Sequence, residues 1–104
     1  MPYLIYAEDY NNKDHIRESI RISHRDYLKS IGKHLLASGA LLSDDGLTVI
    51  GGISLVDFDE EEDALKFANN DPYAKAGIRK TTKIIKWRKR WWDGEFLCTG
   101  TSLS

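Results

Sequence analysis

The chain has 104 residues, of which 41% are hydrophobic and 30% charged, and its formal net charge at pH 7 is −1. These values are ordinary for a globular domain and argue against a disordered chain, a fibrous repeat or a membrane-spanning protein. The length suits one domain with one core. No signal-like apolar stretch opens the chain, so we expect a cytoplasmic location. Cys98 is the only cysteine, which excludes an intrachain disulfide.

The first half of the chain predicts one strand and one long helix. A stretch rich in Tyr, Leu and Ile over residues 3–8 predicts the strand, and a polar loop follows it. After Asp14, a suitable N-cap, apolar residues recur at helical spacing, and Gly39 stands where a C-cap glycine would. We therefore expect a helix over residues 14–38, with a break near Gly32.

The second half predicts a hairpin, a shorter helix and a final strand. Asp59 and Glu62 have the spacing of a capping box, and Pro72 ends the helix that they would begin. We expect a short strand over 40–42, a turn, a strand over 47–58, a helix over 59–70, a loop or single helical turn over 71–77 and a strand over 78–91.

The resulting order, β-α-β-β-α-β, predicts an α+β fold of the ferredoxin-like type, with an antiparallel sheet and two helices on one face. The predicted strand 47–58 is apolar on both faces, with Ile53 and Leu55 on one and Val56 and Phe58 on the other. Two helices cover only one face of a four-stranded sheet. We therefore expect a homodimer that packs sheet to sheet.

His24 is the most informative single residue. It follows Ile20 by four residues and precedes Tyr27 by three, so it shares the helix face that should meet the sheet. A partly buried imidazole needs partners for its nitrogens, and a carboxylate on one nitrogen leaves the other free to exchange a proton. Asp71, at the end of the second helix, is a candidate for that carboxylate, and Tyr73 adds a hydroxyl or an aromatic wall.

A purely structural interpretation of the same residues stays open. Asp71 could cap the turn that follows it, Tyr73 could pack in the core, and His24 could be a satisfied core residue. Arg17 and Arg21, seven and three residues before His24, could line its cleft and bind an anionic ligand, or could be solvated. A pocket at His24 that solvent can enter would favour chemistry, whereas a sealed hydrogen bond would favour architecture.

Four segments resemble the YciI-like, or YCII-related, proteins, over about residues 1–87 of the chain. The most specific is the Asp-Pro-Tyr segment combined with the upstream helical histidine. The segments are 3–9 (YLIYAED), 21–28 (RISHRDYL), 38–42 (SGALL) and 70–78 (NDPYAKAGI).

The resemblance implies a dimeric α/β barrel related to muconolactone isomerase, with a proposed His/Asp pair that corresponds to His24 and Asp71. It implies isomerisation or a dehydrochlorinase-like elimination on a small cyclic or aromatic metabolite, without a cofactor. Candidate substrate-binding residues are Tyr73, Arg21 and Tyr6. The alternative is a catalytically silent dimeric domain that binds a ligand or a protein.

The C-terminal part departs from the family. Residues 1–90 are expected to form the domain and residues 91–104 an extension. Basic residues over 83–90 are interleaved with Trp87, Trp91 and Trp92, which suits single-stranded nucleic acid, but the same alternation is typical of a strand with one wet face. Because the chain lacks an excess of positive charge, we do not expect nucleic-acid binding. The histidines have no metal-ligand spacing.

Overall fold

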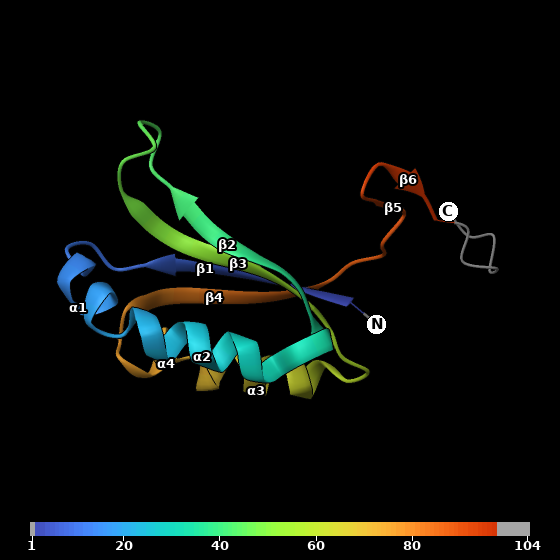
Figure 1. Cartoon of the computed structure of the whole chain (residues 1–104), viewed down its shortest axis with the longest axis horizontal. Coiled ribbons are helices and arrows are strands. Elements are labelled where there is room, and N and C mark those ends of the chain that lie inside the picture. The colour runs from blue at the N-terminus through green and yellow to red at the C-terminus, as the bar shows by residue number, and fades with distance from the viewer. Residues whose placement is uncertain (1, 98–104) are drawn as a thin grey trace.

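The computed structural model describes residues 2–97, and within them it confirms the predicted α+β, ferredoxin-like fold. Four strands form an antiparallel sheet in the order β2-β3-β1-β4. The helices lie against one face of this sheet, and no other described element covers the opposite face (Figure 1). The elements are β1 (Pro2–Asp9), α1 (Asp14–Ser19), α2 (Arg21–Ile31), the 3-10 turn η1 (Gly32–His34), β2 (Leu35–Leu42), β3 (Val49–Asp57), α3 (Glu61–Asn70), α4 (Pro72–Lys75), β4 (Arg79–Lys86), β5 (Trp91–Trp92) and β6 (Glu95–Phe96).

The core lies between the sheet and the helices. Alternate residues of β1 are buried toward the helices, as the period of two in a strand requires, and they pack with Val56 of β3 and Phe67 of α3. Helix α2 has no fully buried residue and packs through partly buried side chains such as Tyr27, whose hydroxyl donates to the Phe67 carbonyl oxygen at 2.9 Å. This bond ties α2, which carries His24, to α3.

The predicted helix over 14–38 is wrong at its end and is interrupted within. It divides at Ile20, α2 stops at Ile31, and the C-cap is Gly32, whose φ of 65° favours glycine. Gly39, expected as the cap, lies inside β2 and pairs with Ile53. Leu35 follows Ile31 by four residues, as in a helix, but pairing with β3 satisfies the backbone groups of this segment and overrides that local pattern.

Two predicted caps are also wrong. The N-cap of α1 is Lys13, not Asp14, and the N-cap of α3 is Glu60, which makes no side-chain cap bond, so Asp59 and Glu62 form no capping box. The last long strand stops at Lys86 rather than at residue 91, and β5 and β6 then form a two-stranded hairpin apart from the sheet (Figure 1). Cys98 lies outside the described residues.

Gly51 and Gly52 mark a close backbone approach inside β3. A Cβ atom on Gly51 would clash with the carbonyl oxygen of Ala7 in β1. The neighbouring β2–β3 register shifts between Leu41 and Leu42. The sheet therefore needs a glycine at position 51 to keep β1 and β3 in register.

Gly51→Ala is expected to lower the free energy of unfolding by about 1–3 kcal/mol, because the backbone must move to admit the methyl group. Gly39→Ala is the matched control, since a Cβ atom at Gly39 meets nothing within 4 Å. Urea denaturation of both variants measures the difference. Equal stability of the two variants would contradict this account of Gly51.

Within residues 2–97, no helix is both long and apolar enough to span a membrane.

Candidate functional site

The structure brings His24 and Asp71 together from different elements. His24 comes from the first turn of α2, and Asp71 from the junction between α3 and α4. The His24 Nε2 atom lies 3.4 Å from Asp71 Oδ2, and the two side chains are 19% and 11% exposed. The pair is thus mostly buried, yet the histidine keeps an accessible surface.

Asp71 also holds the backbone that follows it. Its Oδ1 atom accepts a hydrogen bond from the Tyr73 amide at 2.8 Å and so caps α4, while its Oδ2 atom lies 3.5 Å from Arg79 Nη2. Burial alone raises the pKa of Asp71, but the hydrogen bonds from His24 and Tyr73 and the charges of His24 and Arg79 outweigh burial, and the pKa is lowered. The carboxylate is therefore held in its ionised form.

The Tyr73 ring forms one wall of the site. It stacks on the His24 ring with centroids 4.0 Å apart and planes 20° from parallel. The guanidinium carbon of Arg17 lies 4.4 Å from the Tyr73 centroid, and that of Arg79 lies 5.4 Å from it. The electron-rich ring thus stabilises two cations beside the imidazole.

Asp9 joins the two arginines. Its side chain, only 3% exposed, accepts from Arg79 Nη1 at 2.8 Å and forms a close ion pair with Arg17. Charges of opposite sign alternate from Arg17 through Asp9 and Arg79 to Asp71, and Asp71 also faces His24. Burial lowers the pKa of Arg17, and the nearby charge of Arg79 lowers it further. Tyr73 and Asp71 raise the pKa of Arg17 but do not cancel these effects, and the ion pairs with Asp9 hold both guanidinium groups in place.

A cavity of about 240 Å³ adjoins His24 between α2 and the strands β2 and β3. Apart from Ile53, the residues on its sheet side have little or no side chain. They are Ser38, Gly39 and Ala40 of β2 and Gly51, Gly52 and Ser54 of β3. A Cβ atom on Gly52 would stand 3.4 Å from both terminal nitrogens of Arg79, so the guanidinium lies across this glycine. Small residues on the sheet thus leave room for the arginine and for a ligand.

Residues 1–88 match the YCII-related domain. The chain belongs to this family. Among solved structures, it is similar to 5-chloro-2-hydroxyhydroquinone dehydrochlorinase (TftG) from Burkholderia phenoliruptrix AC1100, in complex with 2,5-dihydroxybenzoquinone. That match has a TM-score of 0.76 and 24% identity, and covers 85% of this chain and 94% of TftG. It shows a shared fold.

Two further structures are more distant. A protein from Arabidopsis thaliana has a TM-score of 0.45 and 13% identity over 84% of this chain and 92% of its own. A protein from Agrobacterium tumefaciens has a TM-score of 0.45 and 17% identity over 83% and 92%. No curated protein matches the chain.

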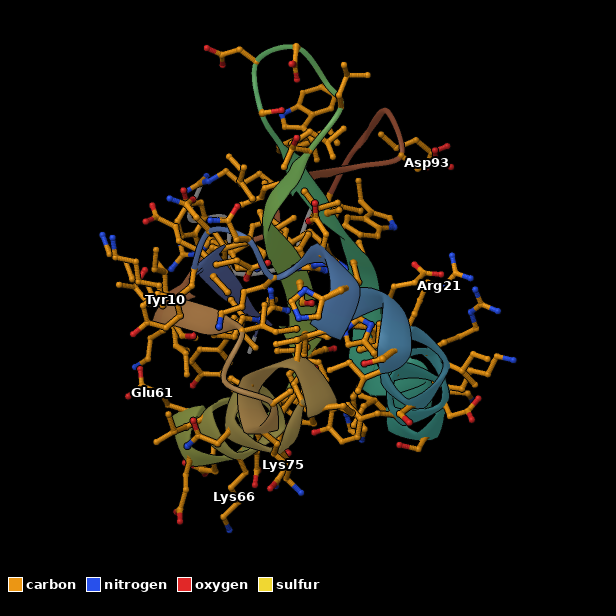
Figure 2. The ribbon with its side chains drawn as sticks, turned by 90° about the vertical axis from the view of Figure 1, so that its left-hand side faces the viewer. Tyr10, Arg21, Glu61, Lys66, Lys75 and Asp93 are labelled. Atoms are coloured by element: carbon orange, nitrogen blue, oxygen red, sulfur yellow. The ribbon has the colours of Figure 1, made fainter. Side chains whose placement is uncertain are left out.

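Two of the residues expected at the site of this YCII-related protein lie away from His24. Arg21 points outward from α2, where its side chain is 57% exposed and pairs with Glu18 at 3.3 Å (Figure 2). Tyr6 lies on the uncovered sheet face, because its β1 neighbours Ile5 and Ala7 are buried toward the helices. Its hydroxyl donates to Glu8 at 3.1 Å.

Arg17 and Arg79 take the places expected of these residues. Because the helix breaks at Ile20, the side chains of Arg17 and Arg21 point in different directions, and of the two only Arg17 lines the cavity. Arg79 lies in the predicted strand over 78–91 and Asp9 in the predicted loop after residue 8, and neither was predicted to belong to the site. Their signal was positional, since Asp9 ends β1 and Arg79 begins the neighbouring strand β4, where the two residues pair.

Among residues 2–97, no group of histidine, cysteine and carboxylate side chains could hold a metal.

Proposed function

We propose that this YCII-related protein is a small-molecule enzyme, acting without a cofactor, in which His24 transfers protons and Asp71 orients its ring. The observation that carries the proposal is that His24 lines an open cavity while its Nε2 atom faces an almost buried carboxylate. A histidine with only a structural role would need the carboxylate but not the cavity. Perturbed ionisable groups that line a cavity are the usual marks of an active site.

The pairing assigns a chemical state to the imidazole. When Nε2 carries the hydrogen shared with Asp71, the neutral ring has its lone pair on Nδ1 and can accept a proton there. The ionised carboxylate also stabilises the imidazolium that results. Because Arg79 and the Tyr73 amide help to keep Asp71 ionised, the carboxylate does not compete for that proton.

The cavity suits a single oxygenated ring. Its 240 Å³ lie below the range of about 300–1,000 Å³ that drug-sized ligands occupy. Arg17 and Arg79 each have five N–H donors, of which their ion pairs use only part, so donors remain for an oxygen of the substrate. TftG is complexed with 2,5-dihydroxybenzoquinone, a compound of this kind. We propose a hydroxylated ring as substrate and isomerisation or elimination as reaction.

One imidazole suffices for elimination of HCl from a chlorinated hydroquinone. A proton first moves from a ring hydroxyl to the carbon that bears chlorine, giving a ketone. Loss of the proton from the hydroxyl on the opposite side of the ring then pushes an electron pair through the ring, and chloride leaves with the pair of the C–Cl bond. The product is the quinone, and no external oxidant is needed. Both proton transfers are of the kind that His24 could perform.

The test is chloride release from 5-chloro-2-hydroxyhydroquinone, followed with a chloride electrode, together with binding of 2,5-dihydroxybenzoquinone. We expect the protein to accelerate chloride release above the rate in buffer. If the quinone binds but neither chloride release nor isomerisation of related hydroxylated rings is accelerated, the alternative of a silent ligand-binding domain holds instead.

We further propose that two copies pack through the uncovered sheet face. On this face Leu4 and Leu55 pair across β1 and β3, and Leu4 pairs with Ile85 of β4, which is 45% exposed. A contiguous apolar surface of this kind on a 104-residue domain favours association. Closure by a two-fold axis would cover the same surface on both copies.

Ile85→Glu is expected to convert the protein from dimer to monomer, because it places a charge in the apolar surface on each side of the two-fold axis. Light scattering coupled to gel filtration measures the mass, which should fall from twice the 11.9 kDa of the chain to that value. Leu47→Glu is the matched control, since Leu47 lies in the β2–β3 turn and is 85% exposed. A wild-type protein of 11.9 kDa in solution would refute the dimer.

A further inference from the structure

Ser38 and Ser54 form a hydroxyl pair on the sheet side of the His24 cavity. They are register partners on β2 and β3, and their Oγ atoms lie 2.9 Å apart. Ser54 also pairs with Ile5, whose side chain is buried toward the helices, so both serines lie on the helix-covered face. They line the same cavity as His24.

The hydroxyl pair keeps unused hydrogen-bonding capacity. Two serines have two O–H donors, and the bond between their Oγ atoms uses one of them. Among residues 2–97, neither side chain has another hydrogen-bond partner, so one O–H and several lone pairs are left at the cavity surface. Ser38 is exposed and Ser54 half-buried, which lets a ligand in the cavity reach this capacity.

We propose that Ser38 and Ser54 position the substrate by hydrogen bonding to a second oxygen substituent of its ring. This oxygen lies away from the one that Arg17 and Arg79 hold. This inference rests on the proposed function and deepens it, because it limits the substrate to planar rings with oxygen substituents on more than one side. A ring with one oxygen would satisfy the arginines or the serines, but not both.

The two layers of the fold support this arrangement. His24 reaches the cavity from the helix layer and the serines reach it from the sheet layer, so a planar ring between the layers meets both. Ala40 and Gly52, which are register partners beside the serines, add almost no side-chain volume. Larger residues there would fill the space that the ring needs.

Titration of 2,5-dihydroxybenzoquinone, which has oxygens around its ring, tests the inference. Ser38→Ala and Ser54→Ala are each expected to weaken its binding by about 3- to 10-fold, the usual effect of losing one neutral hydrogen bond. Ser23→Ala is the matched control, because Ser23 is exposed on α2 and outside the cavity. Ala40→Leu should abolish binding by filling the site. Thermal unfolding of each variant, bound and free, checks that the domain is folded.

The outcomes separate this inference from the proposed function. If the quinone binds the wild type and Ala40→Leu abolishes its binding, but both serine variants bind it within twofold of the wild type, only the role of the serines is overturned. If the wild type does not bind it, the substrate class of the proposed function fails as well. Unchanged affinity in Ala40→Leu would place the quinone elsewhere and overturn the inference.

Discussion

Replacing His24 with Asn is expected to lower the rate of chloride release by about 10²- to 10⁴-fold, the usual contribution of a positioned general acid or base. Asn has an N–H that can still face Asp71, but it has no group that takes up and delivers a proton near neutral pH. Loss of the stacking on Tyr73 should cost only about 1 kcal/mol of unfolding free energy. Steady-state rates and urea denaturation measure the two effects separately.

His15→Asn is the matched control for this experiment. His15 is exposed on α1 and does not line the cavity, so the same substitution there should change neither the rate nor the stability. A His24→Asn variant that unfolds readily but, while folded, retains the wild-type rate would show that the histidine is structural. That result would support the silent binding domain.

Replacing Asp71 with Ala is expected to lower the unfolding free energy by about 2–4 kcal/mol. The α4 cap contributes about 1 kcal/mol, and the loss of a buried partner for His24 and Arg79 contributes about 1–3 kcal/mol. Asp71→Asn should cost less, because its amide oxygen can still accept from the Tyr73 N–H. In urea denaturation at neutral pH, the unfolding free energy should be highest for the wild type, lower for Asp71→Asn and lowest for Asp71→Ala.

The pH dependence of stability provides a second measurement on Asp71. The pKa of this carboxyl is lowered in the folded protein, so its contribution to stability is present above the unfolded pKa of about 3.9 and disappears as the pH falls through the folded value. Between pH 6 and pH 3 the wild type should therefore lose more stability than Asp71→Asn. Asp14→Asn, at an exposed site, should keep the wild-type pH dependence. An equal loss in the wild type and Asp71→Asn would contradict the assigned role.

Much of the fold could be predicted because local patterns and tertiary contacts agree there. Three predicted features match the structure to within a few residues: the strand at residues 3–8, the hairpin turn near Gly46 and the helical turn after Asp71. The first strand of the hairpin is predicted as a strand but is longer than expected. The disagreement at residues 35–38 has a clear cause. A short, mostly apolar run of this kind suits a helix as well as a strand, and only pairing with β3 decides between them.

Some residues of the candidate site could likewise be predicted from the sequence, and others could not. His24 and Asp71 were predicted from helical spacing and from the Asp-Pro-Tyr segment, and the structure places their side chains 3.4 Å apart. Arg21 was preferred to Arg17 because it is nearer to His24 on an unbroken helix, and the break at Ile20 removes that premise. Asp9 and Arg79 are 70 residues apart, and their pairing depends on strand register.

By itself, the sequence determined the order of the main elements, the excess of apolar strand surface and the choice of His24 and Asp71 as a candidate pair, because periodicity, turn chemistry and side-chain type are local properties. The tertiary structure alone decided which arginine faces His24, that Tyr6 lies on the other face of the sheet, and that small residues of β2 and β3 leave a cavity. These features depend on register and on the direction of a helix after a break, which are set by contacts between distant segments.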